Sequence, residues 1–182
     1  MLRVAIRNLV PGVWREISVP DSFSLAQLHR VLQCAFAWMD YHLHEFRVGR
    51  KRFVPDVDEL PGTDTATTTL ASLGLKRGST MVYVYDHGDG WEHAIDVVGV
   101  ARELVDPHTI LMPCILGGER AAPPEDSGGA PGYARLLAAL ADPKHPEHAQ
   151  ARTWVPRGFD PATFDLPSAD HALVLACAWG AI

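Results

Sequence analysis

The sequence predicts an α+β fold in one domain, and three features of its 182 residues indicate this. Apolar and polar residues alternate in several short segments of the first 100 residues, which is the pattern of half-buried strands. One stretch near residue 30 repeats its apolar residues at helical spacing, and further helical patterns follow near the C-terminus. A chain of this length fits one domain with a substantial core. We therefore expect residues 1–182 to form a single domain.

The N-terminal segment predicts a β-hairpin followed by one helix. Residues 2–7 and 13–19 both alternate, and a Pro-Gly turn signal separates them. Ser24 lies three residues before Gln27, which is the arrangement of a capping box. The spacing then predicts a helix over 24–37 that packs its apolar stripe on the hairpin. That stripe consists of Leu25, Leu28, Leu32, Ala35 and Phe36.

The middle of the chain predicts three more strands. Residues 42–48 alternate, and 50–54 form a short return strand after a glycine. Residues 55–68 are rich in Asp, Pro, Gly and Thr and predict a surface loop, followed by a helical turn at 70–74. Residues 80–85 are apolar on both faces, which is typical of a central strand covered on both sides. This order of elements matches a β-grasp (ubiquitin-like) roll, so we expect a β-grasp-like N-terminal part.

The chain then extends that unit. Residues 91–100 predict an extra strand that forms a hairpin with 80–85, which together complete a mixed sheet over about 2–100. Residues 101–131 are rich in Pro and Gly and predict a long loop. C-terminal helices are predicted within 132–182, at 132–140, 146–154 and 171–179.

Composition and charge exclude several classes of protein. No apolar run approaches 18 residues, so no membrane span is expected. The N-terminus alternates apolar and basic residues instead of showing an apolar signal block, which predicts a cytoplasmic protein. Three widely spaced cysteines without a CxxC pair give no disulfide framework or four-cysteine zinc site. The net charge of −6 disfavours nucleic acid as a partner, whereas a protein partner stays open.

Three segments carry residue types that suit metal chemistry. In the first, His42 and His44 lie two apart and would share one strand face, which is a known ligand geometry. In the second, His93 lies on an apolar strand face below a turn that contains Asp86 and Asp89. The alternatives are histidines that pack in the core, and a His–Asp bond or an Asx turn that locks a hairpin.

The third segment places Glu125 and Asp126 between Pro-Pro and Gly-Gly, just before a helix. Two acids precede the glycines and no Lys follows, so a phosphate-binding loop is a poor match. Acids in such a frame suit a cation, although capping of the helix dipole is the alternative. If the three segments meet, their imidazoles and carboxylates would bind zinc, manganese or iron. The predicted ligands are His44, Asp86, Asp89, His93, Glu125 and Asp126.

The ordered motifs of the chain resemble the plasmid pRiA4b ORF-3-like family from about residue 2 to 166. They include Pro11-Gly12-Val13-Trp14-Arg15, His42-Leu43-His44-Glu45-Phe46, Tyr85-Asp86-His87-Gly88-Asp89-Gly90-Trp91-Glu92-His93 and Pro123-Pro124-Glu125-Asp126-Ser127-Gly128-Gly129. The resemblance implies an association with plasmids and mobile elements and supplies no catalytic residue. The family often has cysteines on both sides of its Pro-Pro-Glu-Asp motif, where this chain has Ala122 and Ser127.

Three functions therefore stay open at the level of the sequence. The chain can hold a metal-binding, hydrolase-like pocket in which the metal activates water and Glu125 or Glu92 acts as base. It can be a non-enzymatic binding module that uses a sheet edge or the loop at 101–131. It can also be a structural module in which the tryptophans, His93 and the Pro-Pro-Glu-Asp loop form one rigid corner of the core.

Overall fold

The computed structural model describes residues 1–100, 111–180 and 182, and these form an α+β fold on one mixed sheet. Its eight strands follow the order β5-β4-β3-β6-β7-β1-β2-β8. All neighbours are antiparallel except β4 and β5, which are parallel. The strands are β1 (Leu2–Ile6), β2 (Trp14–Ser18), β3 (His44–Val48), β4 (Lys51–Val54), β5 (Thr63–Asp64), β6 (Thr80–Tyr85), β7 (Trp91–Val97) and β8 (Cys114–Glu119).

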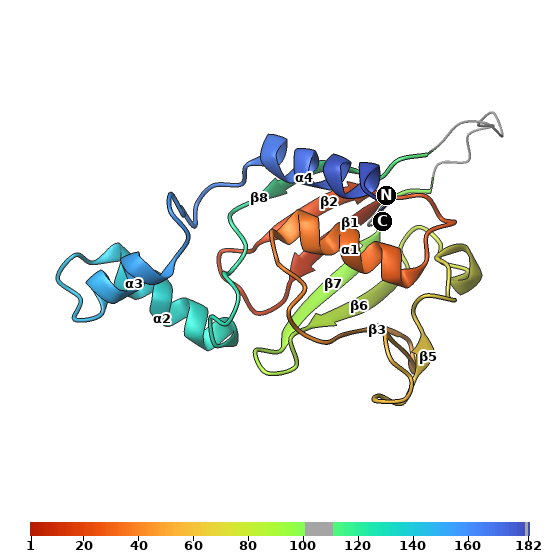
Figure 1. Ribbon diagram of the computed structural model, residues 1–182, viewed down its shortest axis with the longest axis horizontal. Helices are drawn as coiled ribbons and strands as arrows, with labels where there is room; N and C mark the ends of the chain where they lie inside the picture. Colours follow the sequence, from red (N-terminus) through yellow and green to blue (C-terminus); the bar gives the residue numbers. More distant parts are fainter. Residues whose placement is uncertain (101–110, 181) are drawn as a thin grey trace.

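Four α-helices accompany the sheet. They are α1 (Leu25–Phe36), α2 (Gly129–Ala141), α3 (His148–Trp154) and α4 (Leu166–Ala178), and a single 3₁₀ turn, η1, covers Ala71–Leu73. In Figure 1, α1 crosses the front of the sheet and α4 lies beside it near β8, while α2 and α3 lie together beyond one end of the sheet. No helix in the described ranges is long and apolar enough to cross a bilayer.

Helix α1 supplies one side of the core. The predicted capping box is confirmed, because Ser24 and Gln27 exchange hydrogen bonds between their side chains and backbone N–H groups. The helix ends at Ala37, which adopts the left-handed conformation. The apolar stripe predicted from the sequence is fully buried against the sheet. Burial of each large side chain contributes about 2 kcal/mol. The contact between the apolar stripe and the sheet therefore dominates the free energy that holds α1 on the sheet.

A buried arginine joins α1 to the edge of the sheet. The Arg15 side chain is 2% exposed and donates from Nε to the carbonyl oxygen of Ala35, in the last turn of α1. Its Nη1 donates to the carbonyl oxygens of Trp14 and Glu119. Burial lowers the pKa of Arg15 to about 10, which leaves the guanidinium charged at neutral pH. Free carbonyls at a helix C-terminus favour a cation, so Arg15 stabilises both elements.

The central region of the sheet agrees with the sequence in order and pairing. Strand β6 lies between β3 and β7, and the β6–β7 hairpin is confirmed. Strand β7 also pairs with β1, so it separates the N-terminal hairpin from β6. Strand β7, which the sequence predicted as an addition after the β-grasp-like unit, therefore lies in the interior of the sheet.

The prediction of a loop throughout 101–131 is wrong at 114–119, which form a strand, and at 129–131, where α2 begins, while 101–110 lies outside the described residues. Strand β8 runs through this segment and pairs with β2 at the sheet edge. Its Gly117-Gly118 pair hid the strand pattern, since glycine has no side chain to alternate. Gly118 is required there, because a Cβ on it would lie 2.7 Å from the Phe164 ring. The last helix also starts earlier than predicted, with Asp165 as its N-cap.

Candidate functional site

The three chemical segments meet at the end of the β6–β7 hairpin, around His42. Its Nε2 lies 3.3 Å from Asp126 Oδ1, 3.7 Å from Asp86 Oδ2 and 3.9 Å from Glu125 Oε2. The nitrogen is shielded from solvent and forms no hydrogen bond in the described part of the chain. A buried nitrogen that faces three carboxylate oxygens without hydrogen-bond geometry is an unusual arrangement, because buried polar atoms are normally paired. We refer to His42, Asp86, Glu125 and Asp126 as the carboxylate centre.

Asp86 reaches the centre through the turn that follows β6. Its Oδ1 accepts hydrogen bonds from the backbone N–H groups of Gly88 and Asp89, while its Oδ2 faces His42. The side chain is 8% exposed, and the residue has a φ of 56°. Aspartate tolerates this left-handed conformation because its carboxylate can bond to the nearby backbone. The Asx turn expected for this sequence therefore leaves one carboxylate oxygen directed at the imidazole.

Glu125 is held by the segment that follows α1. Its Oε1 accepts hydrogen bonds from the Met39 backbone N–H at 2.8 Å and from the Tyr85 hydroxyl at 3.0 Å. The Trp38 indole N–H donates to the carbonyl oxygen of Pro123 and anchors the same loop. Burial and the adjacent Glu125 raise the pKa of Tyr85, which keeps its hydroxyl protonated as a donor. Glu125 thus has one oxygen fixed by the protein and one oxygen turned towards His42.

Asp89 connects the two turns that carry the acids. Its Oδ2 accepts a hydrogen bond of 2.9 Å from the Gly128 backbone N–H. Gly129 has a φ of +65°, and a Cβ there would lie 2.5 Å from the carbonyl oxygen of Asp89. Gly129 is therefore needed for close contact between the turns. Asp89 holds Asp86 and Asp126 at their present spacing and does not itself face His42.

The spacing of the centre fits a divalent cation. His42, Asp86 and Asp126 each offer a ligand atom, and these atoms lie within 4.8 Å of one another. Two ligands bonded to zinc at 2.0–2.2 Å in a tetrahedral site lie about 3.3 Å apart. The distances of 3.3 to 3.9 Å from His42 Nε2 approach that value. One imidazole with two or three carboxylates is a donor set suited to zinc, manganese or iron.

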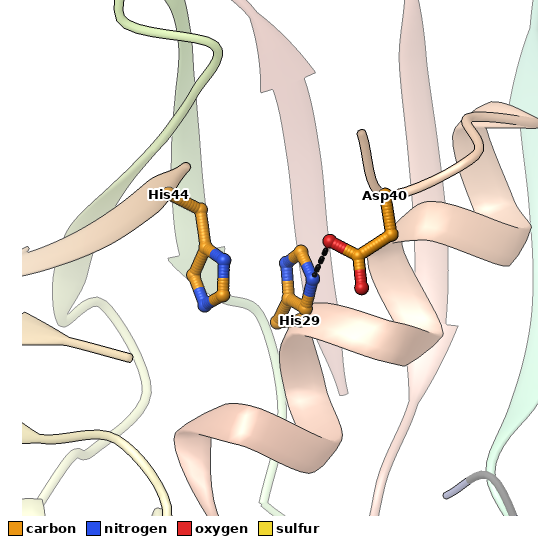
Figure 2. Close-up of side chains that lie close together, drawn as sticks. All are labelled: His29, Asp40 and His44. Atoms are coloured by element: carbon orange, nitrogen blue, oxygen red, sulfur yellow. Dashed lines mark hydrogen bonds and ion pairs between the residues drawn. The ribbon is translucent and has the colours of Figure 1, made fainter. Parts of the chain in front are cut away.

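His44 lies in a second cluster with His29 and Asp40, which we call the histidine network (Figure 2). The His29 and His44 rings stack with their centroids 3.5 Å apart and an interplanar angle of 7°. On the other side of the stack, His29 Nε2 forms a 2.8 Å hydrogen bond with Asp40. His29 Nδ1 bonds to the buried Tyr83 hydroxyl, also at 2.8 Å.

The hydrogen bonds of the network close into a ring. Gln33 Nε2 donates to the Tyr83 hydroxyl, and Gln33 Oε1 accepts from the Asp40 backbone N–H. Tyr83 must then donate to His29 Nδ1, which fixes the His29 proton on Nε2, where it is donated to Asp40. Burial lowers the pKa of His29 to about 4, and burial with the adjacent His29 ring lowers that of His44 to about 3. Both imidazoles are neutral at pH 7.

The histidine network is a poor chelator in this arrangement, although His29, Asp40 and His44 also have ligand atoms within 4.8 Å. An imidazole binds a metal along a direction in its ring plane, and stacked rings direct their lone pairs in parallel. One ion therefore cannot lie in both ring planes. Both nitrogens of His29 are also already hydrogen-bonded. His44 Nε2 is a buried nitrogen without a hydrogen-bond partner in the described residues, as are His42 Nε2, His93 Nε2 and Trp91 Nε1.

The remaining predicted ligand, His93, lies within the core. It is 0% exposed, and its ring packs edge-on against Phe36 and Trp38. Its Nδ1 contacts the carbonyl oxygens of Trp91 and Tyr83. Burial lowers its pKa to about 3, so it remains a neutral core side chain. Of the six predicted ligands, the structure brings together Asp86, Glu125 and Asp126, and it places His44, Asp89 and His93 in other surroundings.

Comparison with known proteins gives the family. The family model described as "Plasmid pRiA4b ORF-3-like protein" matches residues 1–168. The chain belongs to this family. The uncharacterized protein y4hQ of Sinorhizobium fredii (strain NBRC 101917 / NGR234) is 38% identical to this pRiA4b ORF-3-like chain over 157 residues, which cover 84% of this chain and 78% of y4hQ.

A solved structure has the same fold. The crystal structure of the protein of unknown function MM3350 from Methanosarcina mazei Go1 is similar to this family member with a TM-score of 0.81 and 31% identity. The match covers 91% of this chain and 94% of MM3350. Both relatives are described as having no characterised function, so the chemistry must be argued from the pRiA4b ORF-3-like chain itself.

Sequence reasoning missed His29, Asp40 and the role of His42. His29 had a detectable signal, because it is a polar residue one turn after Leu25 on the apolar stripe of α1, where a buried partner is required. His42 was recognised only as a companion of His44 on one strand face. Strand β3 begins at His44, so His42 precedes it in a bend and faces another way.

Proposed function

We propose that this pRiA4b ORF-3-like protein is a metal-dependent hydrolase that binds a divalent cation at the carboxylate centre. The observation that carries this proposal is the unpaired, solvent-shielded Nε2 of His42, which faces three carboxylate oxygens. Without a cation, three acids gathered at one point repel one another. A cation would neutralise them and would take the lone pair of the imidazole.

The donor set supports hydrolytic chemistry. His42, Asp86 and Asp126 would be the protein ligands, and catalytic sites of this type keep a position open for water. A divalent cation lowers the pKa of bound water towards neutrality and so produces a nucleophile. Glu125 would be the general base, because Met39 and Tyr85 fix one of its oxygens and leave the other beside the centre.

Metal binding tests the first part of the proposal. Protein purified without a histidine tag should contain a near-stoichiometric divalent metal by elemental analysis, or take up Mn²⁺ or Zn²⁺ in calorimetric titration. Asp126→Ala should weaken binding by at least about tenfold, because it removes a ligand. Asp126 is 70% exposed, so its loss should leave the fold intact. Asp58→Ala, at another exposed acid, is the matched control. Absence of metal binding by the wild type would reject the centre.

Turnover tests the second part. Chromogenic phosphate and carboxylate esters should be hydrolysed only by metal-loaded protein. Glu125→Gln should retain the metal, because the amide oxygen can still accept the hydrogen bonds of Met39 and Tyr85, but it should lose most of the turnover as the base is removed. Equal turnover in wild type and Glu125→Gln would remove Glu125 from the mechanism.

A binding module is the second candidate function, and the sheet edge favours it. Strand β8 is the last strand of the sheet, and its Leu116 is 46% exposed. Asp170 of α4 accepts the hydrogen bond of Ile115 N–H on this strand, and an edge with an exposed apolar side chain can accept a strand from a protein partner. A partner recovered by wild type and lost by Leu116→Lys, with metal binding unchanged, would favour this function.

We propose that β1 to β6 form a β-grasp-like unit with β7 inserted between β1 and β6. Without β7, the remaining order places the N-terminal hairpin beside β6 with α1 across one face.

A further inference from the structure

A cavity adjoins the carboxylate centre. It has a volume of about 260 Å³ and lies between the acidic loop and helices α2 and α3. Asp126 belongs to both sites, because it lines this cavity and directs Oδ1 at His42. A molecule bound in the cavity would therefore contact a ligand of the proposed cation.

Arg135 gives the cavity a positive group at the side of the acidic loop. Its Nη2 would lie 3.6 Å from a Cβ on Gly132 and 3.9 Å from one on Gly128, so the guanidinium folds back over the first turn of α2. No hydrogen bond or ion pair joins Arg135 to another residue in the described ranges. Its five donors are thus available, and a guanidinium presents them in a planar fork that matches an oxyanion.

The opposite wall suits an apolar or aromatic group. Leu136 and Ala139 come from α2, and Trp154 stands at the end of α3 with 46% of its surface exposed. An exposed tryptophan beside a cavity offers a flat face for stacking and contributes large contact area at low entropic cost. Gln150 adds one neutral hydrogen-bonding group.

The charges of the cavity depend on the cation. Two carboxylates, Asp126 and Glu147, line it beside the single guanidinium of Arg135. The metal-free cavity is therefore not attractive to an anion. A divalent cation held by Asp126 would offset the carboxylates at this end of the cavity, and an anion could then lie between the metal and Arg135.

We propose that this cavity is the substrate pocket of the carboxylate centre and binds an oxyanion, phosphate or carboxylate, carried on an aromatic or apolar group. Arg135 holds the oxyanion and Trp154 packs against its organic part. This inference rests on the proposed metal centre.

The test uses the full chain with Mn²⁺ and three probes: phenyl phosphate, inorganic phosphate and benzoate. Calorimetric titration of Mn²⁺-loaded Glu125→Gln, which retains the metal and loses turnover, should show binding of phenyl phosphate, and the substitutions below are made in this background. Arg135→Gln should weaken it by about tenfold to a hundredfold, the effect of losing hydrogen bonds to a charged group. Trp154→Ala should weaken phenyl phosphate several-fold and leave inorganic phosphate unchanged. Arg152→Gln, on α3 outside the cavity lining, should have no effect.

The outcomes separate the pocket from the metal centre. Mn²⁺ affinity should be the same in wild type, Arg135→Gln and Trp154→Ala, because neither residue belongs to the centre. If Mn²⁺ binds but the probes bind equally well with and without Arg135→Gln, the proposed substrate pocket is wrong and the proposed metal centre is unaffected. If Mn²⁺ fails to bind but phenyl phosphate binds in an Arg135-dependent manner, the oxyanion site stands and the metal centre falls. Binding of benzoate without phenyl phosphate would assign the pocket to carboxylates, and binding of none of the probes would reject it.

Discussion

The histidine network and the carboxylate centre lie close together and use the same residue types, yet they differ in how completely their polar atoms are paired. In the network, both nitrogens of His29 have hydrogen-bond partners, and Tyr83 and Gln33 complete the ring. In the centre, His42 Nε2 has carboxylates around it and no hydrogen bond within the described chain. An open pocket of about 440 Å³ is lined by residues of both, including His42 and His44.

An unpaired nitrogen does not by itself identify a candidate ligand, because His44 Nε2 and His93 Nε2 are unpaired as well within the described chain. What distinguishes His42 is that three carboxylate oxygens lie around its Nε2. A closed ring of hydrogen bonds fixes tautomers and side-chain positions, and it leaves no lone pair on His29 for an ion. A group of acids around an unpaired nitrogen has the opposite property, since only a cation or protons can satisfy it. The network supports the fold, and the centre is where we propose that a cation binds.

Acid should affect the network most. The unfolded chain protonates His29 below its ordinary pKa of 6.5, whereas the folded protein keeps it neutral until about pH 4. The unfolded state then binds more protons, so the free energy of unfolding falls as the pH drops through this window. At pH 4 the loss from this residue is about 3 kcal/mol. Urea titrations at pH 7, 5.5 and 4 measure it. His29→Gln should give a shallower slope, and an unchanged slope would contradict the assignment.

The second-largest effect is expected when alanine variants of His42 and His44 are compared. His42 is a proposed direct ligand, so His42→Ala should reduce Mn²⁺ affinity by at least about a hundredfold. Loss of a residue that only supports a ligand costs up to about that factor. His44→Ala should leave that affinity unchanged and lower the free energy of unfolding by about 2 kcal/mol, because a buried ring leaves a cavity. Calorimetric titration and thermal unfolding of the same two variants give both values. If His44→Ala abolishes metal binding instead, the two clusters have been assigned the wrong way round.

Tyr83→Phe should have a somewhat smaller effect, confined to the network. The substitution leaves His29 Nδ1 without its donor and Gln33 Nε2 without its acceptor, which costs about 2 kcal/mol of stability. Tyr41→Phe is the matched control, because Tyr41 is 68% exposed. Chemical denaturation measures the difference, and Mn²⁺ affinity should be equal in both variants.

Asp89→Ala should produce the smallest change, confined to the centre. Asp89 holds the two acidic turns together through Gly128, so its loss should lower Mn²⁺ affinity by about tenfold without removing a ligand. Asp89→Asn keeps an acceptor oxygen and should restore most of the affinity. Equal Mn²⁺ binding by wild type and Asp89→Ala would show that the turns keep their spacing unaided.

Local patterns predicted much of the fold. The capping box at Ser24, the apolar stripe of α1 and the β6–β7 hairpin depend on residues a few positions apart, and all three are confirmed. Strand β8 could not be found in this way. Its pairing with β2 joins residues about 100 positions apart, and its Gly118 is explained only by the Phe164 ring that packs against it.

The candidate site was predicted in part for the same reason. The sequence indicated the segments that carry Asp86, Glu125 and Asp126, because acids in glycine-rich turns are recognisable without a structure. It did not indicate which histidine joins them. That choice depends on a bend before β3 and on the α1 residue that stacks on His44, which are properties of packing between distant segments.

The sequence by itself determined the α+β class, the capped helix, the family and the acidic turns, since these follow from residue spacing and from ordered motifs. Only the tertiary structure decided that His42 faces the acids while His44 and His93 are packed among rings. The physical reason is that hydrogen-bond partners and lone-pair directions are set by side chains from other strands and helices, and spacing along the chain does not contain them.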